Sequence, residues 1–382
     1  MLHLHKEWSV SFAGCGFMGI YYVGAVSCVL ERFPALLRDA SAVCGASAGA
    51  LMAAVVTLGL PLERCCADLM RVAQRARSRR LGPLHPAFDL LREVRDSLRL
   101  RLPEDAHVRA SGRLCVSLTR VSDGKNVLVS EFGSREELVQ ALVCSCFVPL
   151  YCGVIPPTYR GVHYVDGAIS DNLPRCHRSN TVTFSPYAGE NDVCPRPRSL
   201  WFHQVRFSNV SIQLNSENLY RVTSTFFPPE PEAIAGICQS GYLDALRFLQ
   251  EHGLISSDGP GSTVAGAACC ERATRGEAEQ RGTEHAWLNP QVIAQLPANV
   301  QKVLCEACRE AQGLVSSRGS SSSRSLAQRL TGWIPDVPKD VSWLYGMLQH
   351  VYKAWQDEDE DEDEDSEKPL RRCTSLPLGL NL

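Results

Sequence analysis

The sequence predicts an α/β fold in which a mostly parallel β-sheet is covered by helices. Two observations support this prediction. A β-prone segment at residues 8–13 leads through a glycine-rich turn into an apolar helix that ends near Arg32. A second short strand at residues 40–44 then leads through another turn into another helix. Strands that alternate with helices are typical of parallel sheets, because a parallel crossover needs the length of a helix.

The remaining elements follow from periodicity and from capping and turn residues. Ser134 and Glu137 form a capping box that opens a helix reaching Cys146, and Gly253 is a C-terminal stop. The predicted helices are 61–80, 86–101, 134–146 and 232–253. The predicted strands are 113–120, 126–132 and 181–185, and the first two are joined by a turn at 122–124.

Composition indicates a globular protein and excludes wholesale disorder. Of the 382 residues, 45% are hydrophobic and 21% charged. The net charge of −3 includes nine consecutive acids at 357–365, and without them the chain carries +6. That basic surplus suits phosphate head groups, and we expect no nucleic-acid partner.

Cysteine usage and the N-terminal residues predict a cytoplasmic, non-secreted protein. The 17 cysteines are scattered, and the N-terminus lacks the apolar core of a signal peptide. Cys305 and Cys308 form a lone CxxC without a second ligand pair, so no metal or cofactor is predicted. The uncharged stretch 43–62 contains glycines and ends near Pro61, so we interpret it as strand, turn and helix.

The first chemical motif is Gly45-Ala46-Ser47-Ala48-Gly49, between a strand and a helix. A serine on a sharp strand-to-helix turn presents its hydroxyl at the end of the strand, and small neighbours are needed there. The following helix directs its N-terminus at the serine, which favours developing negative charge. Ser47 is therefore the candidate nucleophile.

The second motif, Gly14-Cys15-Gly16-Phe17-Met18-Gly19, follows the first strand. A dinucleotide-binding fold uses the same spacing but places an acid after the second strand. Here the nearest acid, Asp39, precedes that strand, which leads to Ser47 instead. An oxyanion hole upstream of the nucleophile is the better interpretation, because glycine-rich backbone offers converging N–H groups.

The third motif is Tyr164-Val165-Asp166-Gly167-Ala168. Taken alone, Asp-Gly is more often a simple turn. Together with the two glycine-rich motifs, Asp166 is expected to project its carboxylate over the same sheet edge as Ser47.

These three motifs resemble the patatin-like phospholipase domain family. The segments GFMGIYYVGAVSC, SLTRVSDGKNVLVSEF and VHYVDGAISDNLP are similar to the subgroup of adipose triglyceride lipase and adiponutrin. The resemblance covers residues 6–253, with a weaker similarity at 330–352. It implies a three-layer α/β/α patatin-like fold, and the composition after residue 253 predicts a partly disordered C-terminal region.

The resemblance also implies a Ser47–Asp166 dyad without a catalytic histidine. The N–H groups of Gly14, Cys15 and Gly16 would hold the oxyanion, and Gly19, Gly45, Gly49 and Gly167 would support the motifs. Apolar surroundings would have to raise the pKa of Asp166 for it to act as a base. The chain departs from the family at Met18, where many members have Lys or Arg, and at Ala168, where many have Gly.

A Ser-His-Asp triad is the main structural alternative. It would use GxSxG with one of the later histidines His177, His203 or His252. None of them stands in an informative context, and position 47 is early for an α/β-hydrolase elbow.

We expect four regions: the patatin-like domain at 6–253, a linker-rich region at 254–329 with a short helix near 290–312, an amphipathic aromatic helix at 330–356, and an acidic disordered tail at 357–382. Within the third, Val341, Leu344, Leu348, Val351 and Trp355 keep helical spacing. Packing on the domain, binding to a lipid surface and binding to a partner protein all remain open for that stripe.

The sequence therefore predicts a serine lipid acyl-hydrolase. The resemblance implies that it is peripheral on lipid droplets or endoplasmic reticulum membrane and that its substrates are acylglycerols, triacylglycerol first, or phospholipids. The resemblance implies an α/β-hydrolase-type coactivator partner. Two alternatives remain: a weakly active droplet protein that acts mainly by binding that coactivator, and a lysophospholipid acyltransferase.

Overall fold

The computed structural model describes residues 7–79, 81–176, 180–196, 203–256 and 300–305. A seven-stranded sheet forms its centre, in the order β5-β6-β3-β2-β1-β7, with β4 paired to β3. The strands are β1 (Ser9–Phe12), β2 (Ala42–Gly45), β3 (Leu114–Arg120), β4 (Asn126–Val129), β5 (Thr158–Tyr159), β6 (Val162–Asp166) and β7 (Thr181–Phe184). A separate hairpin contains β8 (Gln204–Phe207) and β9 (Val210–Gln213).

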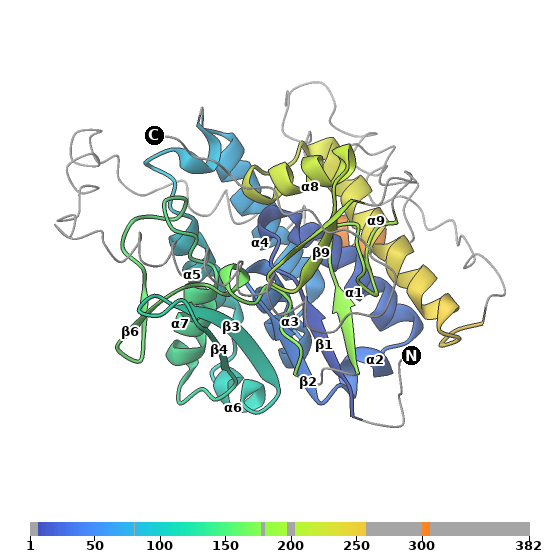
Figure 1. Ribbon diagram of the computed structural model, residues 1–382, viewed down its shortest axis with the longest axis horizontal. Coiled ribbons are helices and arrows are strands. Elements are labelled where there is room, and N and C mark those ends of the chain that lie inside the picture. The colour runs from blue at the N-terminus through green and yellow to red at the C-terminus, as the bar shows by residue number, and fades with distance from the viewer. Residues whose placement is uncertain (1–6, 80, 177–179, 197–202, 257–299, 306–382) are drawn as a thin grey trace, which may run out of the picture.

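Strands β7, β1, β2 and β3 are mutually parallel, and β4, β5 and β6 add an antiparallel edge. The predicted α/β fold with a mostly parallel sheet is confirmed. In Figure 1, β1, β2 and α3 lie in the middle of the molecule, with α5 and α7 on one side and α1 and α9 on the other. The α-helices are α1 (Ile20–Arg32), α2 (Ala35–Arg38), α3 (Ala48–Leu58), α4 (Leu62–Arg77), α5 (Leu90–Arg101), α6 (Ala106–Ala110), α7 (Arg135–Ser145), α8 (Ser216–Phe226) and α9 (Pro231–Glu251). Three short 3-10 helices are η1 (Gly16–Gly19), η2 (Gly82–Leu84) and η3 (Gly167–Ile169).

Most element boundaries fall within a few residues of their predicted positions. The N–H of Glu137 donates to Ser134 Oγ over 3.1 Å and so caps α7, but the Glu137 carboxylate accepts from the N–H of Gly133 instead of Ser134. The stretch 43–62 forms β2, the turn at Ser47 and α3, as interpreted, and no described helix is long and apolar enough to span a membrane. The sequence patterns did not predict α2, α6, α8 or the β8–β9 hairpin.

Helices α1 and α9 pack together through glycines at their contact. A Cβ at Gly24 would lie 1.8 Å from the carbonyl oxygen of Cys238, and one at Gly241 would lie 2.0 Å from that of Tyr21. The Tyr21 hydroxyl donates to Asp244 Oδ2 over 2.8 Å beside this contact. The two backbones therefore approach more closely than any residue with a side chain would allow.

The predicted C-terminal regions lie largely outside the described residues. Residues 300–305 are helical, within the short helix expected near 290–312, and Val300 and Leu304 are buried in the main core. The aromatic helix predicted at 330–356 and the acidic tail at 357–382 stay predictions.

The α1–α9 contact gives a paired stability test within one helix. Gly241→Ala should lower the free energy of unfolding by about 1–3 kcal/mol, because its methyl group overlaps the α1 backbone. Gly236→Ala should raise it by about 0.5–1 kcal/mol, because nothing lies within 4 Å of its Cβ position and alanine favours a helix. Urea unfolding of both variants measures this, and equal effects of the two would contradict the packing account.

Candidate active site

Ser47 lies on a strained turn between β2 and α3. Its backbone has φ 53° and ψ −129°, a left-handed φ that is uncommon for a residue other than glycine. A Cβ at Gly45 would lie 2.5 Å from the carbonyl carbon of Gly49, and one at Gly49 would lie 2.2 Å from the Phe12 oxygen. Both glycines of the GxSxG motif are therefore required by close backbone approach.

Ser145, at the end of α7, holds this turn in place. Its Oγ accepts a hydrogen bond of 2.9 Å from the backbone N–H of Ser47 and donates one of 2.8 Å to the Ser117 oxygen on β3. Ser145 is fully buried. Sequence reasoning missed it, because a single serine in an apolar helix carries no local signal of this long-range contact.

The backbone of Asp166 is fixed on several sides at the end of β6. Its N–H donates to the Phe147 oxygen and its carbonyl accepts from Thr119 Oγ1, both over 2.8 Å. At Gly167 a Cβ would lie 2.1 Å from the Ser117 oxygen. Glycine is needed after Asp166 because the chain packs closely against β3 at this point. A simple Asp-Gly turn would not involve such a contact.

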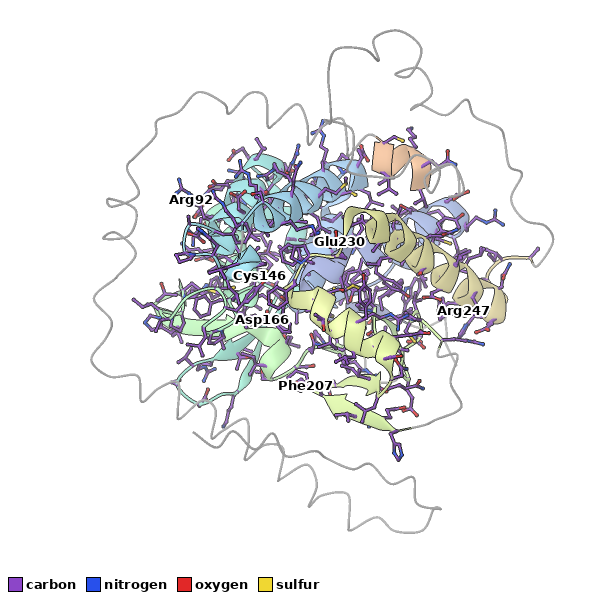
Figure 2. The ribbon with its side chains drawn as sticks, turned by 90° about the horizontal axis from the view of Figure 1, so that it is seen from above. Arg92, Cys146, Asp166, Phe207, Glu230 and Arg247 are labelled. Carbon is purple, nitrogen blue, oxygen red and sulfur yellow. The ribbon has the colours of Figure 1, made fainter. Side chains whose placement is uncertain are left out.

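The Asp166 side chain meets Ser47 in a buried environment. Asp166 is 2% exposed, and its carboxyl group accepts a hydrogen bond of 2.8 Å from the N–H of Ala168 and lies close to the Ser47 side chain. Burial raises the pKa of Asp166 from 3.8 to about 7, although the Ala168 N–H and the Ser47 side chain both act to lower it. This is the direction that a carboxylate base needs. Figure 2 shows Asp166 near the middle of the molecule beside Cys146.

The glycine-rich loop at 14–19 lies directly against Ser47. A Cβ at Gly14 would lie 3.0 Å from the Cβ of Ser47. Gly16 has φ +49°, and its Cβ would lie 2.2 Å from the Thr225 oxygen of α8, so only glycine fits. At Gly19 a Cβ would make ordinary contacts of 3.7 Å or more, so glycine is not required there.

The structure differs from the predicted oxyanion hole at Gly14. The Gly14 N–H donates to Asn172 Oδ1 over 2.6 Å and is therefore already engaged. Within the described part of the chain, the N–H groups of Cys15 and Gly16 donate to no protein acceptor. The Cys15 thiol is buried beside Tyr22, and this burial raises its pKa well above the usual range, so only the Cys15 backbone is suited to bind an anion.

Asn172 is a second site residue that sequence reasoning missed. It is 4% exposed, and its own N–H donates to the Ser208 oxygen in the β8–β9 turn over 2.8 Å. Ser208 Oγ in turn donates to the Ile169 oxygen over 2.9 Å. The hairpin thus supports the segment that connects Asp166 to the glycine loop.

The histidines of the triad alternative do not reach Asp166 where the structure describes them. His203 is exposed before β8, and the His252 ring contacts the Phe248 oxygen at the end of α9. His177 lies outside the described residues. The only side-chain partner of the Asp166 carboxyl group among the described residues is Ser47.

One cysteine cluster could be considered for a metal ion. The Sγ atoms of Cys44, Cys115 and Cys176 lie within 4.8 Å of one another, and those of Cys44 and Cys176 are 2.6 Å apart. Three thiols supply one ligand fewer than a structural zinc site uses. Cys308 of the predicted CxxC lies outside the described residues.

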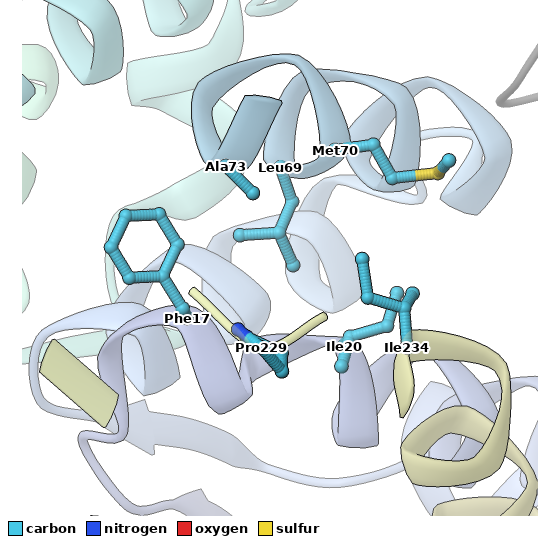
Figure 3. A pocket seen from close by; sticks show the side chains of 7 residues that line it. All are labelled: Phe17, Ile20, Leu69, Met70, Ala73, Pro229 and Ile234. Carbon is cyan, nitrogen blue, oxygen red and sulfur yellow. The ribbon is translucent and has the colours of Figure 1, made fainter. Parts of the chain in front are cut away.

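An apolar pocket opens beside the glycine loop, between η1, α1, α4 and the start of α9 (Figure 3). Phe17, which follows Gly16 directly, is part of its wall. The lining side chains are all apolar: Phe17, Ile20, Leu69, Met70, Ala73, Pro229 and Ile234.

Comparison with known proteins assigns the family. Residues 10–175 match the family described as patatin-like phospholipase. The chain is 43% identical to mouse (Mus musculus) patatin-like phospholipase domain-containing protein 2, over 90% of this chain and 76% of that protein. This chain belongs to the patatin-like phospholipase family. It is also 41% identical to mouse 1-acylglycerol-3-phosphate O-acyltransferase Pnpla3, over 89% of this chain and 87% of that protein. Identity to human (Homo sapiens) patatin-like phospholipase domain-containing protein 5 is 36%, over 90% and 87%.

Membership in the patatin-like phospholipase family supports a lipid hydrolase or acyl-transferring enzyme. The two departures from the usual family pattern have clear positions here. Met18 is 1% exposed and packs in the main core. The Cβ of Ala168 would lie 3.2 Å from a Cβ at Gly14, so its methyl group fills the space beside the loop.

Replacing Ser145 tests the support of the nucleophile turn. Ser145→Ala leaves the half-buried Ser47 N–H without its acceptor, which should lower the free energy of unfolding by about 1–3 kcal/mol and slow hydrolysis of a soluble ester. Ser78→Ala is the matched control, since the Ser78 hydroxyl is exposed and bonds only the nearby Arg75 oxygen. Wild-type stability and rate in Ser145→Ala would show that the contact is dispensable.

The raised pKa of Asp166 predicts a pH-dependent stability difference. Between pH 4 and pH 7 the folded protein keeps a proton that the unfolded chain has lost. The Asp166 contribution to the free energy of unfolding therefore falls as pH rises, by up to about 1.4 kcal/mol per pH unit, and becomes constant above pH 7.

Asp166→Asn removes this titration. Its stability relative to wild type should increase from pH 4 to pH 7 and then stay constant. Chemical unfolding across pH 4–8 measures the difference, and a difference that does not change with pH would contradict a raised pKa.

Proposed function

We propose that this protein is a serine lipid acyl-hydrolase that uses Ser47 as nucleophile and Asp166 as general base. It cleaves long-chain acyl esters, triacylglycerol first, at a lipid-droplet or membrane surface. The observation that supports this most strongly is the proximity of the Ser47 side chain to the Asp166 carboxyl group, in a buried site where the pKa of Asp166 is raised to about 7. A carboxylate with that pKa can accept a proton near neutral pH.

In the proposed reaction, Ser47 Oγ attacks the ester carbonyl while its proton passes to Asp166. The negative oxygen of the tetrahedral intermediate accepts hydrogen bonds from the N–H groups of Cys15 and Gly16. The C–O bond to the glycerol side then breaks, and the leaving alkoxide takes the proton from Asp166. The acyl group remains as an ester on Ser47.

Deacylation reverses the roles. Asp166 removes a proton from water, the hydroxide attacks the acyl ester, and Ser47 recovers its proton as the fatty acid leaves. One carboxylate serves both halves, because no histidine partner is used.

The long-chain acyl part of the proposed substrate rests on the sequence similarity to adipose triglyceride lipase. The apolar pocket at Phe17 and Ile20 lies beside the proposed oxyanion donors, but its volume of about 10 Å³ is that of a single water molecule, so it does not itself hold an acyl chain. The preference for triacylglycerol rests on the sequence similarity to adipose triglyceride lipase. The coactivator partner and peripheral location rest on the same similarity.

Acyl transfer is a second candidate, favoured by the 41% identity to the mouse protein named as a 1-acylglycerol-3-phosphate O-acyltransferase. The same acyl-enzyme would then react with a lysophospholipid hydroxyl in place of water.

Labelling by a fluorophosphonate tests the nucleophile whatever the substrate. Wild type should be labelled and Ser47→Ala should not, because only an activated hydroxyl attacks the phosphorus atom. Ser240→Ala on α9 is the control, since the Ser240 hydroxyl is exposed and bonds within its own helix. Equal labelling of wild type and Ser47→Ala would refute the proposed function.

A further inference from the structure

Helix α8 has its polar and apolar sides reversed relative to an ordinary surface helix. Asn218 is 2% exposed, and its side chain bonds the backbone of Ala188 and Gln213 at 2.8–2.9 Å. Leu219, in contrast, is 69% exposed, and Val222 and Phe226 continue the same outward stripe at helical spacing. A helix that buries amides and exposes leucine and phenylalanine indicates an apolar partner on its outer side.

Two other segments add exposed apolar side chains next to the C-terminal end of α8. The Tyr151 hydroxyl donates to the Phe226 oxygen over 2.5 Å, which brings the preceding Leu150 beside this end. Leu150 is 70% exposed and has φ 67°, a left-handed conformation that leucine rarely adopts. The Phe227 ring lies 3.9 Å from the Cβ position of Gly82 in η2, whose neighbours Leu81 and Leu84 are also exposed.

We call this surface the apolar rim. It consists of Leu81, Leu84, Leu150, Leu219, Val222, Phe226 and Phe227. Figure 1 shows α8 at one end of the molecule, far from α6.

The apolar rim adjoins the candidate active site through two of its segments. The Thr225 oxygen, one residue before Phe226, lies against Gly16 of the glycine loop. Phe147, in the segment that leads to Leu150, accepts the hydrogen bond from the N–H of Asp166. Two of the three rim segments are thus connected directly to groups proposed to act on the ester.

Two arginines without an ion-pair partner among the described residues lie close in sequence to the η2 segment of the apolar rim. Arg79 precedes η2 and Arg92 is in the first turn of α5; both are exposed, as is the acidic Asp89 that caps α5. The nearby Arg75 and Arg77 are paired with Glu93 and Glu230. Free guanidinium groups next to exposed leucine and phenylalanine match a surface of apolar chains under anionic head groups.

We infer that the apolar rim is a docking surface for an anionic phospholipid layer and that it delivers the ester to Ser47 from that layer. This surface belongs to the described domain and involves none of the residues of the stripe predicted at 341–355. The inference extends the proposed function. Only the statement that the delivered molecule is an ester cleaved at Ser47 rests on that function; the docking itself does not.

Vesicle binding by the full-length chain tests the inference. The variant is Leu150→Ser/Leu219→Ser, and the matched control is Val108→Ser/Leu243→Ser, which removes exposed apolar side chains from α6 and α9. Co-sedimentation with phosphatidylcholine–phosphatidylserine vesicles should weaken about tenfold or more in the variant and stay at the wild-type value in the control. Both proteins keep residues 341–355, so that segment contributes equally.

Two further measurements separate the alternatives. Arg79→Gln/Arg92→Gln should reduce the preference for vesicles with phosphatidylserine over those of phosphatidylcholine alone. Hydrolysis of a soluble short-chain ester should match wild type in Leu150→Ser/Leu219→Ser, while hydrolysis of an emulsified long-chain ester should fall.

Wild-type vesicle binding by the variant would overturn the inference, and so would an equal loss in the control. A changed oligomeric state with unchanged vesicle binding would likewise overturn it and assign the apolar rim to self-association. Absence of soluble-ester hydrolysis in wild type would contradict the proposed function instead, while the vesicle result would still decide the docking surface.

Discussion

The chemistry proposed for this protein depends on one buried carboxyl group that has few polar contacts. Asp166 is almost fully enclosed; its carboxyl group accepts a hydrogen bond from the Ala168 N–H and lies close to the Ser47 side chain. A charged carboxylate with so little compensation is costly, so burial outweighs both contacts and raises the pKa to about 7. The same desolvation that disfavours the charged form makes Asp166 a base of useful strength near neutral pH.

The surrounding fold holds that carboxyl group and Ser47 in fixed positions close to each other. Strand β3 contributes at two points: the Ser117 oxygen accepts the hydrogen bond of Ser145, which holds Ser47, and Thr119 bonds the Asp166 backbone. Each of these contacts joins segments far apart in the sequence. The dyad geometry is therefore a property of the parallel sheet and its antiparallel edge, not of either motif alone.

Much of this arrangement could be predicted from the sequence, because its signals are local. The glycines around Ser47 and after Asp166 are forced by backbone contacts below 3 Å, and such constraints leave motifs that are easy to recognise. The parallel strands and their helices follow from periodicity for the same reason. Ser145 and Asn172 escaped prediction because their roles depend on partners about 100 or more residues away. Helix α8 was missed although its apolar residues keep helical spacing and Asn215 caps its start, so its sequence signal was present and overlooked.

The central claim is that Asp166 acts as the base with a pKa raised by burial. Its most direct test is the pH dependence of kcat/KM for a soluble ester, measured with wild type and Asp166→Asn. The account predicts a rate that rises with pH through an apparent pKa near 7 in wild type and very little activity in the variant. A wild-type rate governed by an apparent pKa near 4, or an unchanged profile in Asp166→Asn, would contradict it.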